Sequence, residues 1–133
     1  MKKTKKANKD MPVGDKALLM AGWLYEKKAE NITVLDVEGV CPITEALVVV
    51  SARNTRQAKA LADYVLDKAG EEGFIYLGLE GYRQGQWVLL DFNDVLVHIF
   101  LDEFRQFYNI EGLWSEGKRL PLSFLKEDKK ADA

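Results

Sequence analysis

The strongest structural signal in the sequence lies in residues 85–100, GQWVLLDFNDVLVHIF. Two runs rich in β-branched and apolar residues flank an Asn, which tolerates the positive φ of a tight two-residue turn. We therefore predict two antiparallel strands joined at residues 92–93, with Asp91 opposite Asp94. In this register, Trp87 lies opposite His98.

The two faces of this predicted hairpin differ, because side chains alternate across a strand. One face is uniformly aliphatic, which indicates core: Val88, Leu90, Val95, Val97 and Ile99. The other mixes apolar, aromatic and acidic side chains: Trp87, Leu89, Asp91, Asp94, Leu96, His98 and Phe100. Solvated faces and buried faces seldom have this composition, whereas docking surfaces do. We therefore predict that these seven residues bind a partner.

The remaining elements follow from apolar periodicity. The spacing predicts an amphipathic helix over residues 15–28, capped by Asp15, and a longer one over 55–69, which Asn54 caps and Gly70 ends. Strands are predicted at 32–37, 46–52 and 74–79, and a short helix at 102–107. This order predicts a two-layer α/β sandwich, with helices on the aliphatic face of a mixed β-sheet. The long helix makes a right-handed crossover if the strands on either side of it are parallel.

The composition is typical of a single soluble domain, with 133 residues, 47% of them hydrophobic and 30% charged. We place the domain at residues 14–120, between a flexible basic tail at 1–13 and a flexible charged tail at 121–133. The net charge of −2 gives no overall reason for specific nucleic-acid binding, and no apolar run is long enough for a membrane. A single Cys41 excludes an internal disulfide and favours a reduced cytosolic setting.

Several short motifs, taken in order, resemble the Iojap-type ribosomal silencing factors. That family has a stretch similar to residues 87–100, with Trp-Val, a following Asp, then Gly-Asp-Val and Val-His among hydrophobic residues. Further matches are Val34-Leu35-Asp36-Val37, Ile43-Thr44, Ala60-Leu61-Ala62-Asp63, Leu79-Glu80-Gly81 and Phe107-Tyr108-Asn109-Ile110-Glu111-Gly112-Leu113-Trp114. The resemblance extends over residues 16–114, the size of one compact module.

The resemblance implies a nucleotidyltransferase-like fold and a cytoplasmic repressor of translation that is not an enzyme and uses no cofactor. Such proteins bind the large ribosomal subunit through the fourteenth protein of its series, on the intersubunit face, and block joining of the small subunit by steric competition. Trp87 is then the anchor, with Leu89, Leu96, His98 and Phe100 around it. Asp91 and Asp94 would steer a basic partner. Self-association into a homodimer through the same face is a further hypothesis.

An enzymatic alternative rests on Asp36 and Glu38, which lie two apart on one strand. A metal-dependent nucleotidyltransferase or hydrolase needs such carboxylates, and Asp91 could add a third. No Gly-Ser phosphate-binding turn precedes them at the required distance, so a polar strand end is the simpler interpretation. Where the family has Gly-Thr-Ser and a His, this chain has Ala52-Arg53-Asn54 and Gln57, which weakens the enzymatic alternative further.

Individual residues also admit structural roles. Asp91 and Asp94 suit the ends of a turn, where carboxylates accept backbone hydrogen bonds, and a neighbouring cation would relieve their repulsion. His98, the only histidine, is interpreted as a packed, hydrogen-bonded residue. Trp87 suits either a core or a partner contact. The aromatic segment at residues 104–114 is expected to pack on the sheet, with part of it left to join the docking surface.

One basic pair stands apart from these residues. Arg53 and Arg56 lie near the predicted start of the long helix. They could bind an anion there, although no Gly-rich loop accompanies them.

Overall fold

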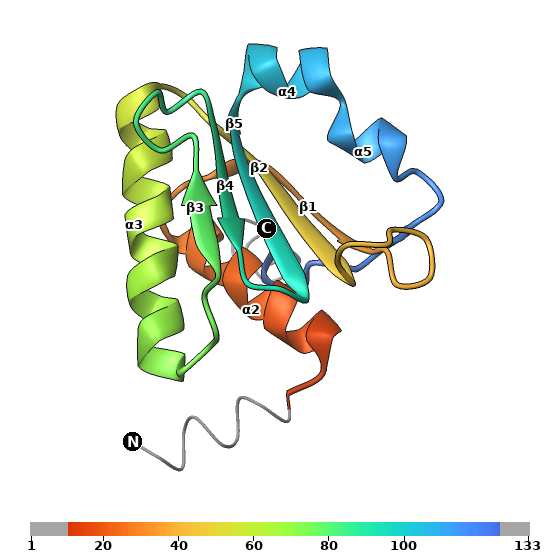
Figure 1. Ribbon diagram of the computed structural model, residues 1–133. Helices are drawn as coiled ribbons and strands as arrows, with labels where there is room; N and C mark the ends of the chain where they lie inside the picture. The colour runs from red at the N-terminus through yellow and green to blue at the C-terminus, as the bar shows by residue number, and fades with distance from the viewer. Residues whose placement is uncertain (1–10, 126–133) are drawn as a thin grey trace, which may run out of the picture.

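The computed structural model describes residues 11–125, and the strands within this range form one mixed six-stranded sheet (Figure 1). In sheet order they are β3 (Gly78–Glu80), β4 (Trp87–Asp91), β5 (Val95–Leu101), β2 (Ala46–Ala52), β1 (Glu30–Asp36) and β6 (Lys118–Arg119). Strands β2 and β5 run parallel, and the other neighbours run antiparallel. The predicted α/β class with a mixed sheet is confirmed.

Helices α2 (Val13–Glu26) and α3 (Thr55–Glu72) cover the aliphatic face of the sheet, as predicted (Figure 1). The inward stripe of α3 repeats at helical spacing and is buried: Ala58, Leu61, Ala62, Val65 and Ala69. The predicted core residues of the hairpin, Val88, Leu90, Val95, Val97 and Ile99, are completely buried beneath these helices. Strand β2 is buried along its whole length, because side chains cover both of its faces.

Two predicted helix ends are corrected. Asn54 caps α3 as expected, since its side chain accepts a hydrogen bond from the Gln57 N–H at 2.8 Å. Gly70 does not end that helix; the helix continues to Glu72, and Gly73 terminates it in a left-handed conformation with φ 77°. Helix α2 begins directly after Pro12, before the predicted cap at Asp15, and no side chain caps it. Pro12 is the N-cap residue, with φ −59° and ψ 146°.

The hairpin register differs from the prediction by two residues. Trp87 pairs with Phe100, Leu89 with His98, and Asp91 with Leu96. The turn consists of Asn93 and Asp94 rather than residues 92–93, because the Phe92 N–H still pairs with Val95 O at 2.9 Å. Asn93 has the expected positive φ, 74°. A shift of two preserves the alternation, so every strand residue stays on its predicted face.

The connection through α3 also differs from the simplest expectation. The parallel neighbour of β2 is β5, and β3 lies at the far edge of the sheet. The crossover therefore contains α3, β3 and β4. The strand predicted at 74–79 is shorter and begins later, as Gly78–Glu80, and Ile75, Tyr76 and Leu77 before it are exposed.

The second face of the sheet carries a smaller apolar cluster, formed around Leu35, Leu47, Val49 and Phe100. Two short helices, α4 (Asp102–Tyr108) and α5 (Ile110–Leu113), follow β5 at this side (Figure 1). The chain supplies Phe104, Ile110 and Trp114 from this segment to cover the cluster. The second face is therefore partly closed by the chain itself.

The chain after β6 packs on the first core, where we expected a flexible segment from residue 121. Leu122 and Phe124 contact that core, and the Phe124 ring lies 4.8 Å from the Tyr25 ring. The remainder of both predicted tails, residues 1–10 and 126–133, lies outside the described residues. Within residues 11–125, no helix combines the length and apolar character needed to cross a membrane.

Candidate docking surface

The seven residues predicted to bind a partner are not equally accessible. Leu96, His98 and Phe100 on β5 are buried, with 8%, 5% and 0% of their surface exposed. Trp87, Leu89 and Asp91 on β4 are only partly covered. The difference arises because β5 lies inside the sheet and leads into α4, whereas β4 lies nearer the sheet edge. The predicted surface is thus partly interior, and its accessible part lies on β4.

Trp87 is fixed in place by contacts on several sides. Its indole Nε1 donates a hydrogen bond to His98 Nδ1 at 3.0 Å. Its ring stacks on Phe100, with centroids 4.9 Å apart, and approaches the Tyr108 ring at 4.6 Å. The contact between Trp87 and His98 was predicted as a directly opposed pair; it is a diagonal one, since Trp87 pairs with Phe100.

His98 has the packed, hydrogen-bonded role expected of it. Burial lowers the pKa of its imidazole from 6.5 to about 4, because the charged form loses its hydration. The ring is therefore neutral near pH 7, and its Nδ1 is free to accept the Trp87 hydrogen bond. A positively charged ring would donate at both nitrogens and could not accept this bond.

Two aromatic residues of α4 extend the accessible area beside Trp87. Tyr108 is 47% exposed, and Phe107, which meets the Tyr108 ring edge-on at 5.0 Å, is 78% exposed. We call Trp87, Leu89, Phe107 and Tyr108 the aromatic surface. The sequence allowed for exposed aromatic residues in this segment but did not identify which ones. Their exposure depends on how α4 sits on the sheet.

The two aspartates near the turn have different environments. Asp91 Oδ1 accepts a hydrogen bond from the Asn93 N–H at 2.8 Å, which is the turn-stabilising role proposed for it. Asp94 instead contacts the Lys16 ammonium of α2 at 2.7 Å. Lys16 is the neighbouring cation that the sequence required but could not identify. Asp91 and Asp94 therefore do not face each other, contrary to the predicted register.

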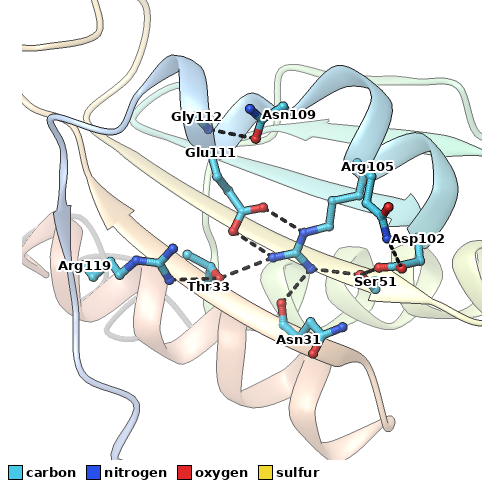
Figure 2. Close-up of polar contacts among 10 residues, drawn as sticks. Asn31, Thr33, Ser51, Asp102, Arg105, Asn109, Glu111, Gly112 and Arg119 are labelled. Atoms are coloured by element: carbon cyan, nitrogen blue, oxygen red, sulfur yellow. Dashed lines mark hydrogen bonds and ion pairs between the residues drawn. The ribbon is translucent and has the colours of Figure 1, made fainter.

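Arg105 ties α4 and α5 to the sheet, and sequence reasoning missed this residue (Figure 2). Its guanidinium makes paired hydrogen bonds of 2.8 and 2.9 Å to the Glu111 carboxylate on α5. It also donates to Asn31 O at 2.6 Å on β1 and to Ser51 Oγ at 2.9 Å on β2. With 9% of its surface exposed, Arg105 is a buried cation whose hydrogen-bonding groups are well matched.

The surrounding polar groups complete this network. Asn31 has φ 52° at an irregularity in the pairing of β1, and its carbonyl accepts from Arg105. Hydrogen bonding to Arg105 lowers the pKa of the Glu111 carboxyl below its usual range. The only sequence signal was an Arg among the aromatic residues of a short helix, with an acid six positions later. That signal could not identify the partners on β1 and β2.

The carboxylates of the enzymatic alternative lie at the end of β1. Asp36 Oδ1 accepts a hydrogen bond from the Glu38 N–H at 3.1 Å, as expected for a polar strand end. Asp36, Glu38 and Glu45 line a hollow near the start of α2. Within residues 11–125, no group of three or more His, Cys, Asp or Glu side chains is arranged to hold a metal ion.

The chain is similar to known proteins along most of its length. Residues 10–133 match the family model described as "Ribosomal silencing factor during starvation". A Bacillus subtilis protein named ribosomal silencing factor is 34% identical over 99 residues, which cover 74% of this chain and 84% of that protein.

Structural comparison and a more distant relative agree with this result. A crystal structure of a Chromobacterium violaceum protein superimposes with a TM-score of 0.76 at 35% identity, covering 79% of this chain and 88% of that one. A mouse protein named "Mitochondrial assembly of ribosomal large subunit protein 1" is 26% identical over 73% of this chain and 44% of its own length.

Proposed function

The chain belongs to the family of ribosomal silencing factors, and we propose that it binds the large ribosomal subunit in the cytoplasm and sterically blocks joining of the small subunit. We propose that its contact is on the intersubunit face, at the fourteenth protein of the large-subunit series, as the family resemblance implies. The name of the mouse relative refers to assembly of the large subunit, which supports this choice of subunit. The mechanism forms and breaks no covalent bond and needs no cofactor.

The observation that carries this proposal is the state of Trp87. Contacts within the chain fix its side chain, which stays partly exposed. Partner-binding hot spots are often Trp or Tyr residues on well-packed surfaces. Trp87 is hydrogen-bonded to His98 and stacked on Phe100, so it loses little further freedom when a partner covers it. Phe107 and Tyr108 enlarge the apolar area that a partner would bury.

The seven predicted residues then divide into two roles. Trp87, Leu89 and Asp91 face the partner directly, with Asp91 supplying negative charge for a basic surface. His98 and Phe100 contact Trp87 from the neighbouring strand, and Leu96 belongs to the buried cluster against which Trp87 packs. Asp94 is neutralised by Lys16 within the chain, so its contribution to steering is smaller than the sequence indicated.

Gradient sedimentation tests the proposal directly. The purified protein should co-sediment with large subunits and reduce the fraction that joins when small subunits are added. Trp87→Glu should lower the affinity for large subunits by about 30-fold or more, the loss expected for a hot spot of about 2 kcal/mol. Co-sedimentation without any effect on joining would contradict steric blocking.

A second variant distinguishes a loss of binding from a loss of folding. Phe107→Glu removes an exposed side chain and should weaken subunit binding while the melting temperature stays unchanged. Ile75→Glu, at an exposed apolar position outside the aromatic surface, is the matched control and should bind normally. Equal effects of the two substitutions would reject the aromatic surface as the docking site.

The competing occupant of this surface is a second copy of the chain. A homodimer through the aromatic surface would hide Trp87 and Phe107 until the ribosomal partner displaced it. Light scattering at several protein concentrations measures this self-association. Phe107→Glu should then make the protein more monomeric.

A further inference from the structure

Four cationic side chains surround an open hollow where α2 ends and α3 begins. Lys27 and Lys28 follow α2, while Arg53 and Arg56 lie on either side of the Asn54 cap. The hollow between them has a volume of about 360 Å³. All four side chains are exposed. We call Lys27, Lys28, Arg53 and Arg56 the basic patch.

Hydrogen bonds from Gln57 hold together the two backbone segments that carry the basic patch. Gln57 Nε2 donates to Lys28 O at 3.2 Å, and its Oε1 accepts from the Arg53 N–H at 2.7 Å. One side chain therefore connects the end of α2 to the start of α3. Lys28 turns the chain here with φ 71°, a conformation that a Lys seldom adopts.

Acidic neighbours neutralise the basic patch only in part. Glu30 lies 3.8 Å from Arg53, and both side chains are more than half exposed, so this pair is weak. Glu26 accepts a hydrogen bond from the Tyr64 hydroxyl, and Lys27 lies over the Tyr64 ring at 4.7 Å. Across residues 11–125, no carboxylate comes within ion-pairing distance of Lys28 or Arg56.

The basic patch lies at the same end of the sheet as the aromatic surface. The row Trp87, Phe100 and Ser51 crosses β4, β5 and β2, and Arg53 follows Ser51 by two residues. Figure 1 shows the start of α3 and the whole of α4 at this end. The aromatic surface is on the face opposite to α2 and α3, so a partner that covers it reaches the basic patch by extending around this end of the sheet, as one the size of a ribosomal subunit can.

We propose that the basic patch binds backbone phosphates of ribosomal RNA next to the protein on which the aromatic surface docks, an inference that rests on the proposed function. Arg guanidinium groups match phosphate oxygens in geometry, and phosphate contacts position a protein without reading sequence. Six of the seven residues that line the hollow have charged or polar side chains, and four of these are the cations of the patch. The patch thus provides a local site for phosphate in a chain whose net charge is negative.

A double substitution, Arg53→Gln with Arg56→Gln, tests the inference on intact large subunits. At low salt the variant should bind about tenfold more weakly or worse. A plot of log affinity against log salt concentration should become less steep, by about 0.7 to 0.9 for each phosphate that the variant no longer neutralises. Lys68→Gln with Lys118→Gln removes the same charge at positions outside the patch and should change neither quantity. Unchanged binding by the double Arg variant would overturn the inference.

A second measurement separates RNA from protein as the partner of the patch. The double Arg variant should bind the isolated fourteenth large-subunit protein as tightly as the unsubstituted chain does. An equal loss on the isolated protein would assign the patch to an acidic protein surface and reject the RNA contact. Failure of the unsubstituted chain to bind large subunits would instead reject the proposed function, whatever the double variant does.

Discussion

At the residue scale, His98 and Trp87 act as a pair whose hydrogen bond requires a neutral imidazole. His98 is buried on a central strand, and its Nδ1 accepts from the Trp87 indole at 3.0 Å. Burial of His98 therefore makes the hydrogen bond that holds Trp87 dependent on pH. The pKa of about 4 places this dependence below the physiological range.

Acidification should destabilise the fold through His98. The unfolded state binds a proton near the ordinary pKa of 6.5 and the folded state only near 4, so stability falls as pH drops between these values. At pH 4.5 the loss relative to pH 7.5 should be about 2 to 3 kcal/mol from this group. Urea unfolding at a series of pH values measures it.

His98→Gln provides the control for this effect. Gln keeps an acceptor for the Trp87 indole but does not titrate, so its stability should change much less between pH 7.5 and 4.5. The Glu111 carboxyl has a lowered pKa, and its contribution disappears only at more acidic pH. A wild-type protein as insensitive as the His98→Gln variant would mean that His98 is not buried as described.

At the element scale, α4 and α5 are joined to the sheet by polar contacts as much as by apolar ones. Arg105 connects α4 to β1, β2 and α5, and Asp102 adds a bond to Ser51 at 3.2 Å (Figure 2). This attachment places Tyr108 against Trp87. The position of the aromatic surface therefore depends on the buried Arg105 guanidinium, which lies on the same short helix as Phe107 and Tyr108.

Removal of the Arg105 side chain should free this segment while sparing the rest of the fold. Arg105→Leu leaves the Glu111 carboxylate without its partner and should cost about 3 kcal/mol, as expected when one member of a buried pair is removed. Hydrogen exchange should become faster in α4 and α5, and binding to large subunits should weaken because Tyr108 no longer supports Trp87.

Arg119→Ala is the matched control for that substitution. Arg119 makes one long hydrogen bond of 3.5 Å to Thr33 and a minor charge interaction with Glu111 in the same region, so its removal should cost less than about 0.5 kcal/mol. Equal exchange rates in α4 for Arg105→Leu and the unsubstituted chain would show that apolar packing alone holds the segment.

At the scale of the whole molecule, the two faces of the sheet have separate tasks. Helices α2 and α3 complete a large core on one face, which stabilises the domain. The other face carries a smaller cluster whose edge stays accessible around Trp87. A rigid body of this kind can act as a steric block without a change of shape, provided that it binds where the second subunit would contact the first.

Steric blocking predicts a dependence on the order of addition. Protein mixed with large subunits before small subunits are added should prevent joining in proportion to the sites occupied. The same protein added to ribosomes that have already joined should have little effect until they dissociate, because its site is covered. Gradient profiles from the two orders measure this. Rapid splitting of joined ribosomes would indicate an active mechanism instead.

Local periodicity was enough to establish the class of fold, the aliphatic core and the membership of each face of the sheet. The hairpin shows the limit of this reasoning. A two-residue slip keeps the same faces, so periodicity could not choose between the two registers, and the burial of Phe92 selected the longer pairing. The motifs of residues 16–114 likewise indicated the family, which the match of residues 10–133 to the family model confirmed.

In contrast, only the tertiary structure decided which side chains are exposed and which charged groups pair with each other. Lys16 and Asp94 are 78 positions apart, and Arg105 meets the Asn31 carbonyl across 74, distances over which sequence spacing carries no information. The same holds for Phe100, which had the pattern of an exposed face but is covered once α4 folds back over it. Long-range packing fixes these contacts, since each requires two elements brought together by the whole fold.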